Sequence, residues 1–477
     1  MKIKNICCIG AGYVGGPTMA VIADHWPSIQ INVVDINEER INDWNNQDLN
    51  KLPIFEPGLD KIIARCRNKN LHFSTDVESN ISNADLIFIS VNTPTKTKGH
   101  GAGQASDLKW VDASARKISK YARGETIVVE KSTLPVKTAE TIKKILQVVD
   151  KNNEYESNTS KQFSILSNPE FLAEGTAIND LINPDRVLIG GDDEKAIKAL
   201  SEIYQEWVDP SKIITTNLWS SELSKLIANA FLAQRISSIN SMTALCEATG
   251  ANISEVSKAV GTDNRIGSKF LNPGPGFGGS CFKKDILNLV YICRHYGLNK
   301  VADYWLGVVE INNWQKNRIS QIIYEKLFGT ISGKKIAILG FAFKANTNDT
   351  RESPAITICK ELLEEGANLK IFDERVTCEQ IKIDLKENKY YSDGDGEEGH
   401  WTFSQDIIKT TEDSDAVIVL TESKLFKFIN WEIISKKMRS PSWLFDTRGV
   451  VDTSEALKNN INVWSVGSGD LMRKNLY

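Results

Sequence analysis

Short runs rich in β-branched residues alternate with helical patterns along most of the chain. The runs span residues 3–9, 31–35, 86–91, 126–131, 163–167 and 187–190, and then 335–339, 369–373, 416–420 and 443–446. Strands that alternate with helices form parallel sheets with helices on both faces. The sequence therefore predicts an α/β fold with two Rossmann-like, doubly wound sheets.

A long helical segment separates the two alternating regions. Residues 219–249 contain neither glycine nor proline, and at 1.5 Å per residue such a helix would be roughly 45 Å long. Further helical patterns follow to about residue 327. We therefore predict three domains: a Rossmann-like domain over 1–215, a central helical domain over 216–330 and a second Rossmann-like domain over 331–477.

Composition excludes several classes of protein. The net charge of the 477 residues is −4, which gives no general case for binding nucleic acid or an anionic membrane. No run approaches 18 apolar residues, and the amino-terminal segment lacks the features of a signal peptide, so we expect a cytoplasmic protein. The eight cysteines include no C-x-x-C pair, which predicts reduced thiols and neither a zinc site nor a disulfide framework. Polar stretches at 151–161 and 388–400 are expected to be surface loops.

The two alternating regions share one plan. In each region the first strand ends at a glycine, the second ends at an aspartate, and the expected third strand follows an acidic residue. These pairs are Gly10 and Gly340, Asp35 and Asp373, and Asp85 and Asp415.

The first glycine turn predicts a dinucleotide site. Gly10-Ala-Gly12-Tyr-Val-Gly15 follows the first strand directly, and Asp35 ends the second strand. Glycines let the backbone approach a pyrophosphate at the start of a helix, and the aspartate accepts a hydrogen bond from a ribose hydroxyl. Because a carboxylate repels a 2′-phosphate, we expect NAD rather than NADP, although Arg40 is the kind of residue that accommodates that phosphate.

The second glycine turn, Gly340-Phe-Ala-Phe-Lys344, does not have the G-x-G-x-x-G spacing. It indicates a nucleotide of another kind or in another position. Lys344 and Arg351 could hold phosphates there, or they could be solvated surface charges. Their place at the carboxyl end of a strand favours the first interpretation, because ligands bind at that edge.

A glycine-rich loop leads into a helix that begins near Cys281. With Ser280 as the expected N-cap, the thiol would face the positive end of the helix dipole, and Lys283 and Lys284 add positive charge. These features favour a thiolate, and Asp285 would share its helix face. The alternative is a buried cysteine that packs as a small apolar residue.

Polar residues elsewhere complete a candidate catalytic site. Lys225 and Asn229 are four residues apart on the long helix and share a face. Lys225 is either a buried lysine with a shifted pKa or a lysine on a solvated face. Ser132 and Thr133 follow one predicted strand, and a segment with Glu170 and Glu174 follows the next; such residues serve either catalysis or helix capping. A thiolate beside a nicotinamide can trap an aldehyde and carry it through a thioester, which water must then hydrolyse.

Several motifs together resemble the UDP-glucose/GDP-mannose dehydrogenase family, and within it the animal-type UDP-glucose 6-dehydrogenases, over nearly the whole chain. They are Ile6-Cys-Cys-Ile-Gly-Ala-Gly-Tyr-Val-Gly-Gly-Pro17, Val91-Asn-Thr-Pro-Thr-Lys-Thr97, Ser167-Asn-Pro-Glu-Phe-Leu-Ala-Glu-Gly175, Asn229-Ala-Phe-Leu-Ala-Gln-Arg-Ile-Ser-Ser238 and the loop 276–285. The resemblance implies that UDP-glucose is oxidised twice at C6 to UDP-glucuronate with two NAD. It also makes domain 1–215 the NAD-binding domain, 216–330 the dimerisation and catalytic domain, and 331–477 the UDP-sugar-binding domain.

The resemblance assigns roles to individual residues. Cys281 is similar to the nucleophile, Lys225 to the group that stabilises the oxyanion, and Glu170 to the acid-base group of thioester hydrolysis, while Asp285, Thr133 and Asn229 would position water and support the lysine. The implied cofactor contacts are Gly10, Ala11, Gly12, Tyr13, Val14, Gly15, Asp35, Arg40, Val91, Thr93, Ser132, Thr133, Glu174, Lys284 and Arg351. The implied substrate contacts are Glu170, Phe171, Leu172, Lys225, Asn229, Arg265, Phe277, Gly278, Phe343, Lys344 and Arg448.

Assembly and specificity follow from the resemblance as well. Arg265 is similar to a residue that reaches the neighbouring subunit's substrate, which implies a homodimer as the minimal active unit and, in related enzymes, a hexamer formed as a trimer of dimers. Asn272-Pro-Gly-Pro275 departs from the family pattern and lacks its lysine contact to substrate. The alternatives are a sister dehydrogenase acting on GDP-mannose or a UDP-N-acetylhexosamine, and a non-catalytic NAD-binding protein.

Overall fold

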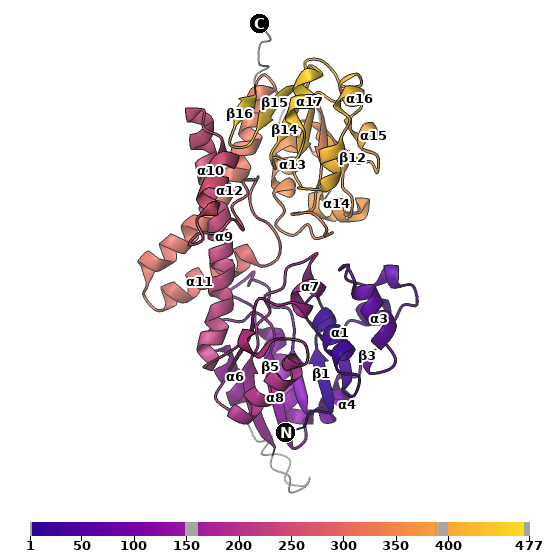
Figure 1. Cartoon of the computed structure of the whole chain (residues 1–477), viewed down its shortest axis with the longest axis vertical. Helices are drawn as coiled ribbons and strands as arrows, with labels where there is room; N and C mark the ends of the chain where they lie inside the picture. The colour runs from indigo at the N-terminus through magenta and orange to yellow at the C-terminus, as the bar shows by residue number, and fades with distance from the viewer. Residues whose placement is uncertain (1, 148–160, 387–388, 391–398, 472–477) are drawn as a thin grey trace. The chain divides into compact units, whose positions relative to one another are not determined.

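The computed structural model describes residues 2–147, 161–386, 389–390 and 399–471. It divides into two compact units, Met1–Ala228 with Leu287–Gly297, and Asn229–Ile286 with Leu298–Tyr477. Figure 1 shows the elements of both units. Most of the predicted loops at 151–161 and 388–400 lie outside the described residues, and the three-domain division stays a prediction.

An eight-stranded sheet forms the centre of the first unit, in the order β3-β2-β1-β4-β5-β6-β7-β8. All its neighbouring strands are parallel except β6 and β7, which run antiparallel where the sequence predicted a parallel pair. Its strands are β1 (Asn5–Ile9), β2 (Gln30–Val34), β3 (Leu71–Ser74), β4 (Leu86–Ile89), β5 (Glu125–Glu130), β6 (Gln162–Ser167), β7 (Val187–Gly191) and β8 (Ile213–Thr216). The sequence did not predict β3 and β8, because they have four residues each and mixed polarity.

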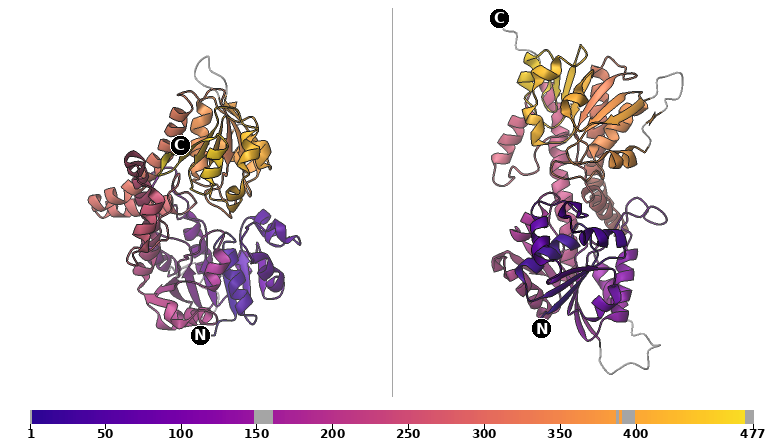
Figure 2. Two further views of the ribbon diagram at one scale, coloured as in Figure 1. Left: turned by 45° about the horizontal axis from the view of Figure 1, so that its top comes forward. Right: turned by 90° about the vertical axis from the view of Figure 1, so that its right-hand side faces the viewer.

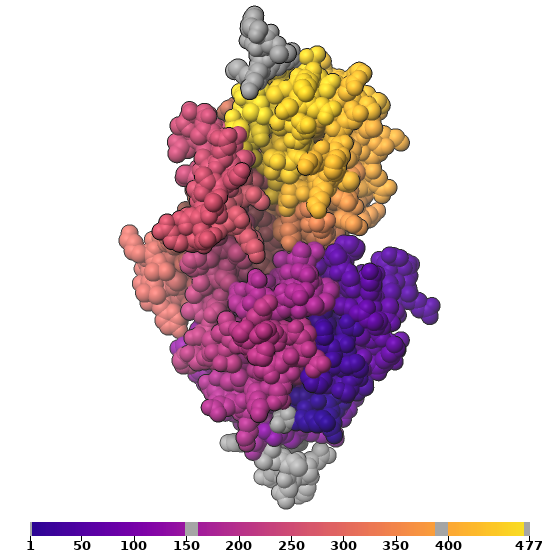
Figure 3. All heavy atoms as spheres, viewed as in Figure 1, coloured from indigo at the N-terminus to yellow at the C-terminus, as the bar shows by residue number. Residues whose placement is uncertain are grey.

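Helices cover both faces of this sheet (Figure 2). They are α1 (Gly15–His25), α2 (Glu38–Trp44), α3 (Leu59–Cys66), α4 (Val77–Ser82), α5 (Lys109–Tyr121), α6 (Thr138–Leu146), α7 (Ala177–Ile182) and α8 (Glu194–Gln205), with short 3-10 turns at Leu49–Lys51 and Pro210–Lys212. Because strand side chains alternate, Ile6 and Cys8 of β1 pack in one apolar cluster with α1, α3 and α8, while Cys7 and Ile9 pack in another with α4, α5 and α6. In Figure 3 the magenta atoms of the segment that contains α8 cover much of the front of this unit, beside the indigo atoms of its first residues.

Four helices lie along the chain between the strands of this sheet and those of a second sheet. The long helix α9 (Leu218–Thr249) has 32 residues and begins one residue before the predicted start. It is followed by α10 (Ile253–Thr262), α11 (Phe282–His295) and α12 (Asn299–Lys326). The boundary between the two units falls within α9 and again within α11.

The second unit contains another eight-stranded sheet, in the order β11-β12-β10-β9-β13-β14-β15-β16. Its strands are β9 (Lys335–Leu339), β10 (Asn368–Phe372), β11 (Lys389–Tyr390), β12 (Gly399–Phe403), β13 (Ala416–Val419), β14 (Trp443–Asp446), β15 (Asn462–Ser465) and β16 (Gly469–Leu471). Its helices are α13 (Pro354–Glu364), α14 (Cys378–Leu385), α15 (Ile407–Thr411), α16 (Trp431–Ser435) and α17 (Thr453–Lys458), with a 3-10 turn at Lys424–Phe428. Apolar clusters lie on both faces of this sheet as well, so the predicted α/β class with two doubly wound sheets is confirmed.

The plan that the sequence repeats has a structural cause. Asp85 accepts hydrogen bonds from the backbone of Lys4 and Asn5 at the start of β1, and Asp415 accepts one from Lys335 at the start of β9. Each aspartate therefore fixes the beginning of the central strand of its sheet. The strands that follow the two aspartates, β4 (Leu86–Ile89) and β13 (Ala416–Val419), are not the third strands of their sheets as predicted. The unpredicted strands β3 and β12 precede them in the chain.

Candidate active site

The first glycine turn leaves room for a ligand at one position. At Gly10, with a φ of +109°, an added Cβ would lie 2.2 Å from the Ser90 carbonyl oxygen, and at Gly15 it would lie 2.1 Å from the Gly10 carbonyl oxygen. At Gly12 an added Cβ would meet nothing within 4 Å. Gly10 and Gly15 thus allow tight packing, while Gly12 faces open space, as a turn that binds a phosphate requires. The other residues of the predicted turn are the buried Ala11 and the half-buried Tyr13 and Val14.

Asp35 lies beside this turn. Its Oδ2 accepts hydrogen bonds from the Ala11 N–H at 2.9 Å and from Arg40 Nη1 at 3.0 Å, and its Oδ1 accepts one from the Asn37 N–H at 3.0 Å. Since a carboxylate has about four acceptor positions, one remains for a ribose hydroxyl. Arg40 is paired with Asp35, so its charge is already neutralised at the place where a 2′-phosphate would need it.

The corresponding aspartate of the second sheet has a different environment. Asp373 accepts hydrogen bonds from the backbone N–H groups of Phe341, Ala342, Arg375 and Val376. All of its acceptor positions are therefore occupied by its own backbone. The two turns share one backbone plan, but of these two carboxylates only that of the first turn keeps an acceptor position for a ribose.

Predicted cofactor contacts meet at the carboxyl ends of β4 and β5. The Ser132 hydroxyl donates to the Val91 carbonyl oxygen at 2.7 Å, and the Thr93 hydroxyl donates to the Thr133 carbonyl oxygen at 3.1 Å. The structure thus brings Val91, Thr93, Ser132 and Thr133 together at the edge where ligands bind in such sheets.

Lys131 is a buried residue that contacts Glu170 and was not among the predicted site residues. Lys131 is 3% exposed, and its Nζ lies 2.8 Å from Glu170 Oε2, 3.0 Å from Asn168 Oδ1 and 3.3 Å from the Tyr204 hydroxyl. The sequence feature that could have identified Lys131 is its place directly after a buried strand, in the segment Glu130-Lys131-Ser132-Thr133.

This ion pair sets the charge of Glu170. Burial alone would raise the pKa of the carboxyl, but the neighbouring Lys131 ammonium and the Phe171 N–H more than offset it, so the pKa is lowered. Burial likewise opposes the charge of Lys131, yet Glu170 and Tyr204 raise its pKa overall. Glu170 is therefore a carboxylate at neutral pH and has the protonation state of a base.

Lys225 lies in the same unit as Glu170. It is 7% exposed, and its Nζ lies 5.3 Å from the centre of the Phe171 ring. Its charge helps to lower the pKa of Glu170. The burial predicted for this lysine of the long helix is thus confirmed. Leu172 and Glu174 lie with Phe171 in the half-buried loop after β6.

A pair of buried carboxyl groups lies just before Lys225. Glu130 is 1% exposed and Glu222 is 3% exposed, and the two carboxyl groups interact with one another. Glu222 also accepts hydrogen bonds from the Lys137 and Ala139 N–H groups, both at 2.8 Å, at the start of α6. Burial and the charge of Glu222 raise the pKa of Glu130 well above its usual value, which favours the protonated form of Glu130.

In the second unit, Asn229 and Asp285 are in direct contact. The Asn229 amide donates to Asp285 Oδ2 at 2.6 Å, and both side chains are nearly inaccessible, at 4% and 2% exposure. Lys284 Nζ lies 3.9 Å from Asp285 Oδ1. The structure thus brings together Asn229 of the long helix and Asp285, to which the resemblance assigned one role.

Cys281 is the one exposed cysteine among the eight, all of which lie within the described residues and none of which forms a disulfide. Its carbonyl oxygen accepts a hydrogen bond from the Asp285 N–H at 2.9 Å, and its Sγ lies 3.4 Å from Ser280 Oγ. Because α11 begins at Phe282, Cys281 itself directly precedes the helix, and the prediction of Ser280 as its N-cap was wrong by one residue. An exposed thiol at a helix start is accessible to a substrate, unlike a core cysteine.

The glycine loop before Cys281 packs on the second sheet's first turn. An added Cβ at Gly279 would lie 3.0 Å from the Phe343 ring, and one at Gly278 would lie 2.7 Å from the Glu352 carbonyl oxygen. Phe277 is buried against Phe282, with their ring centres 5.8 Å apart. Glycine is thus required here for close approach, which explains a loop with so little side-chain volume.

Basic side chains project from the same region of the second unit. Arg448 donates to the carbonyl oxygens of Leu420 at 2.8 Å and Phe343 at 3.0 Å, and its Nη1 lies 3.1 Å from Glu422 Oε2. Arg448 is therefore held in one orientation. Lys344 Nζ lies 5.5 Å from the centre of the Phe343 ring.

Two predicted residues form local ion pairs. Arg351 binds Asp349 through two nitrogens at 2.8 Å and 2.6 Å, which orients its guanidinium. Arg265 pairs with Asp263 at 2.6 Å, and its side chain is 89% exposed. Arg265 thus lies at the surface of its own chain, paired with a residue two positions before it.

The residues predicted for the chemistry therefore divide between the two units. Glu170, Phe171 and Lys225 belong to the first unit, and Cys281, Asp285 and Asn229 belong to the second. Among the described residues, no group of three or more His, Cys, Asp or Glu side chains is arranged to hold a metal ion. No helix within the described ranges combines the length and apolar character needed to cross a membrane.

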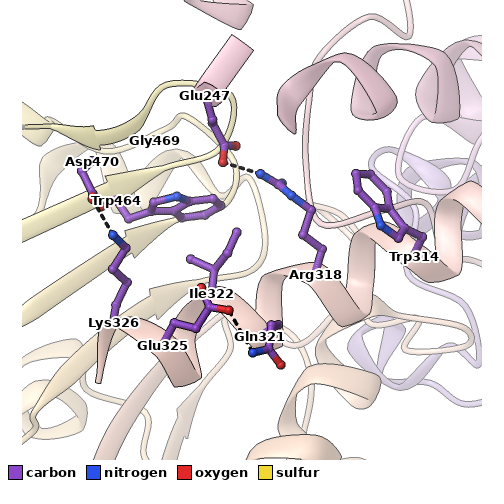
Figure 4. A pocket seen from close by; sticks show the side chains of 10 residues that line it. All are labelled: Glu247, Trp314, Arg318, Gln321, Ile322, Glu325, Lys326, Trp464, Gly469 and Asp470. Atoms are coloured by element: carbon purple, nitrogen blue, oxygen red, sulfur yellow. Dashed lines mark hydrogen bonds and ion pairs between the residues drawn. The ribbon is translucent and has the colours of Figure 1, made fainter. Parts of the chain in front are cut away.

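A cavity of about 530 Å³ lies elsewhere in the second unit, between the end of α9, α12, β15 and β16. Figure 4 shows Arg318 paired with Glu247 and Lys326 paired with Asp470 around Trp464. None of the predicted site residues lines it. Since its charged groups bind each other, we assign no ligand to this cavity.

Comparison with known families identifies three matching regions. Residues 4–208 match the UDP-glucose/GDP-mannose dehydrogenase family, NAD binding domain; residues 219–314 match the central domain of that family, and residues 337–453 match its UDP binding domain. The prediction of NAD as the cofactor is confirmed by the first match, and the Gly12 and Asp35 geometry fits that cofactor.

Individual relatives are similar over nearly their whole length. The chain is 53% identical to UDP-glucose 6-dehydrogenase 1 of Glycine max, with 97% of each chain covered, and 54% identical to UDP-glucose 6-dehydrogenase of Gallus gallus, with 94% of this chain and 90% of that protein covered. Among solved structures, a UDP-glucose dehydrogenase from Pyrobaculum islandicum has a TM-score of 0.81 at 28% identity, with 98% of both chains covered. The plant and animal relatives are thus similar to the chain to the same degree.

Proposed function

The chain belongs to the UDP-glucose/GDP-mannose dehydrogenase family, and we propose that it oxidises UDP-glucose at C6 to UDP-glucuronate with two NAD and one water. The observation that carries this proposal is the identity of 53–54% to UDP-glucose 6-dehydrogenases across nearly the whole chain. The balanced reaction converts UDP-glucose, two NAD⁺ and water into UDP-glucuronate, two NADH and three protons. We place it in the cytoplasm.

Cys281 is the proposed nucleophile. NAD, when bound to the first unit, accepts one hydride in each of the two oxidations. After the first oxidation the C6 aldehyde adds the Cys281 thiolate, which forms an S–C bond and a thiohemiacetal. Loss of the second hydride from C6 leaves a thioester on Cys281. The exposure of this thiol at the start of α11 supports its role.

The remaining groups handle charge and protons. Lys225 stabilises the oxyanion on C6 in both addition steps and takes part in proton transfer. Glu170, which Lys131 keeps ionised, accepts a proton from the water that attacks the thioester. The C–S bond then breaks, and the thiolate and the C6 carboxylate are released. Thr133, Asn229 and Asp285 position the water, an assignment supported by the short Asn229–Asp285 contact.

The remaining predicted contacts keep their proposed roles. Phe171, Leu172, Phe277, Gly278, Phe343, Lys344 and Arg448 would hold the UDP-sugar, and Lys284, Glu174 and Arg351 would contact NAD. The fixed orientation of Arg448 supports its role as a diphosphate or sugar contact.

We also propose a homodimer as the minimal active unit and a hexamer built from three dimers. Phe231, Met242 and Leu245 on α9 and Tyr304 on α12 are large apolar residues with 43–58% exposure. Such residues are covered when two copies associate. The exposed Arg265 would then contribute to the partner's substrate site.

The decisive experiment is the NADH yield with a panel of nucleotide sugars. We expect two NADH per UDP-glucose and no comparable turnover of GDP-mannose or UDP-N-acetylhexosamines. A yield of one NADH would indicate a simple alcohol oxidation, and preference for another sugar would indicate a sister dehydrogenase. Absence of turnover with every sugar would favour an NAD-binding protein without catalysis.

The covalent mechanism has its own test. Replacement Cys281→Ala should abolish UDP-glucuronate formation, and Cys378→Ala, which changes a partly buried cysteine outside the site, should not. Unimpaired carboxylate formation by the Cys281 variant would exclude the thioester route.

A further inference from the structure

One face of α12 carries buried polar residues. Asn312, Gln315 and Lys316 stand at helical positions i, i+3 and i+4, so they share a face, and they are only 2%, 0% and 4% exposed. Buried polar groups require hydrogen-bond partners, and these three find them on the backbone of two other segments. The first of those segments leads to Cys281.

Asn312 binds both backbone groups of Phe277. Its Oδ1 accepts a hydrogen bond from the Phe277 N–H at 2.7 Å, and its Nδ2 donates to the Phe277 carbonyl oxygen at 3.1 Å. An added Cβ at Gly276, where φ is +127°, would lie 2.8 Å from Asn312 Oδ1. The amide therefore sits against the loop as a neighbouring strand would, at a place where only glycine leaves room for it.

The neighbouring residues fix both sides of this contact. Gln315 Nε2 donates to the Gly274 carbonyl oxygen at 3.0 Å, and Asn240 Oδ1 of α9 accepts from the Gly274 N–H at 2.9 Å. Lys316 Nζ donates to the Glu352 carbonyl oxygen at 3.4 Å. Glu352 in turn binds Lys283, two residues after Cys281, at 2.9 Å.

The loop needs such contacts because its own sequence does not define its path. Three of the four residues from Gly276 to Gly279 are glycine, which has the largest backbone freedom of all residues. Besides Asn312, the loop backbone is held through the Gly279 N–H, which donates to the Arg351 carbonyl oxygen at 2.8 Å. Without Asn312, two buried backbone groups would lose their partners four residues before the thiol.

We propose that Asn312 is a positioning residue for Cys281: by holding the backbone of Phe277 it fixes the glycine loop and thereby the place of the thiol at the start of α11. The proposal rests on the proposed function, in which Cys281 is the nucleophile. Asn312 touches neither substrate nor cofactor in this scheme, so its effect is exerted through the loop alone.

The test compares Asn312→Leu with Asn313→Ala. Leucine has nearly the shape of asparagine and no hydrogen-bonding group, while Asn313 is an exposed neighbour on the same helix. For Asn312→Leu we expect kcat with UDP-glucose to fall roughly 10- to 100-fold, as misplacement of a reacting group does. The KM for NAD should stay within about two-fold, because the matched NAD binding domain covers other residues. Asn313→Ala should match the unmodified protein.

A second readout follows Cys281 without turnover. The rate of Cys281 alkylation by iodoacetamide is measured against pH, with the modified peptide identified by mass spectrometry. For Asn312→Leu we expect that the rate of Cys281 alkylation changes and that its dependence on pH is displaced. A general loss of stability would not change either quantity in the molecules that remain folded. Should this variant fail to fold, Asn312→Asp keeps the acceptor for the Phe277 N–H, removes the donor, and is expected to change the same two measurements in the same direction.

An unchanged kcat together with an unchanged alkylation profile in the folded variant would overturn the proposal. This result is distinguishable from failure of the proposed function. If the unmodified protein does not oxidise UDP-glucose, the function is wrong, yet the alkylation profiles still decide whether Asn312 positions the thiol.

Discussion

The charge of Glu170 depends chiefly on one buried ion-pair partner, Lys131. Burial raises the pKa of this carboxyl, and Lys131 at 2.8 Å reverses that effect. The ionised form that a base requires is therefore present above a lowered pKa and is lost only when the pH falls through it.

Replacement Lys131→Met should remove that protection. The effect of burial would then be opposed less strongly and the pKa of Glu170 would rise, so the acid limb of the kcat–pH profile should move to higher pH. The profile of Lys198→Met, which changes a lysine that is 78% exposed, serves as control. Superimposable acid limbs in the two variants would show that Lys131 does not set the charge of the base.

The buried carboxyl pair of Glu130 and Glu222 predicts an effect of pH on stability. The folded-state pKa of Glu130 is raised, whereas the unfolded value is about 4.3, so its contribution is complete below about pH 4.3 and is lost as the pH rises through the folded pKa. Replacement Glu130→Gln keeps a hydrogen-bond donor for Glu222 and cannot ionise. The free energy of unfolding of the variant minus that of the unmodified protein should therefore increase by about 1.4 kcal/mol for each unit by which the pH rises between those two pKa values.

Urea denaturation at several pH values between 4 and 8 measures this difference. Glu202→Gln, a change at a glutamate that is 56% exposed, should follow the unmodified protein throughout. Parallel stability curves for Glu130→Gln and the unmodified protein would mean that Glu130 is not the protonated member of the pair.

At the scale of elements, two glycines of the turn after β1 have different roles: Gly12 leaves space for a ligand, and Gly15 allows close packing. The open space at Gly12 predicts that Gly12→Val leaves the thermal midpoint within a few degrees but weakens NAD binding at least roughly 10-fold, because the side chain occupies the phosphate position. Gly15→Ala should instead destabilise the fold by about 1–3 kcal/mol or more, since its Cβ would lie 2.1 Å from the Gly10 carbonyl oxygen. Calorimetric NAD titration and thermal unfolding measure both. Equal loss of stability in the two variants would contradict the assignment.

Element prediction succeeded where patterns were long or strongly apolar. Strands β9 and β14 have the predicted bounds, and the long helix α9 differs from its prediction by one residue. Strands β3 and β12 were missed because their residues alternate with polar ones and lie beside helical or polar stretches. The antiparallel pairing of β6 and β7 was also not predictable, because strand direction depends on how the connecting segment returns to the sheet.

At the scale of the whole molecule, the proposed dimer predicts complementation between inactive subunits. Arg265→Ala should impair the partner's site, and Cys281→Ala should inactivate its own. In a mixed dimer, the subunit with an intact Cys281 receives the intact Arg265 from the other subunit. Random reassociation of equal amounts should therefore restore about a quarter of normal activity.

The control for this experiment is a mixture of Cys281→Ala with Lys225→Ala. Under the mechanism above, each subunit supplies its own Lys225 and Cys281, so each site of their mixed dimers lacks one of these residues and mixing should restore no activity. A double variant carrying both Arg265→Ala and Cys281→Ala in one chain should not complement itself either. Light scattering before mixing establishes the oligomeric state. Absence of any gain on mixing Arg265→Ala with Cys281→Ala would exclude a shared site.

The sequence by itself determined the two α/β sheets, the NAD turn, and the residue types needed for thiol chemistry, because these depend on local periodicity and on motifs with fixed spacing. Only the tertiary structure decided which polar groups are neighbours. Lys131 meets Glu170, Glu130 meets Glu222, and Asn312 meets Phe277 across 39, 92 and 35 positions of the chain, as their residue numbers give. Such contacts set charge and position, and they leave no local pattern, since each depends on the packing of elements that are distant in sequence.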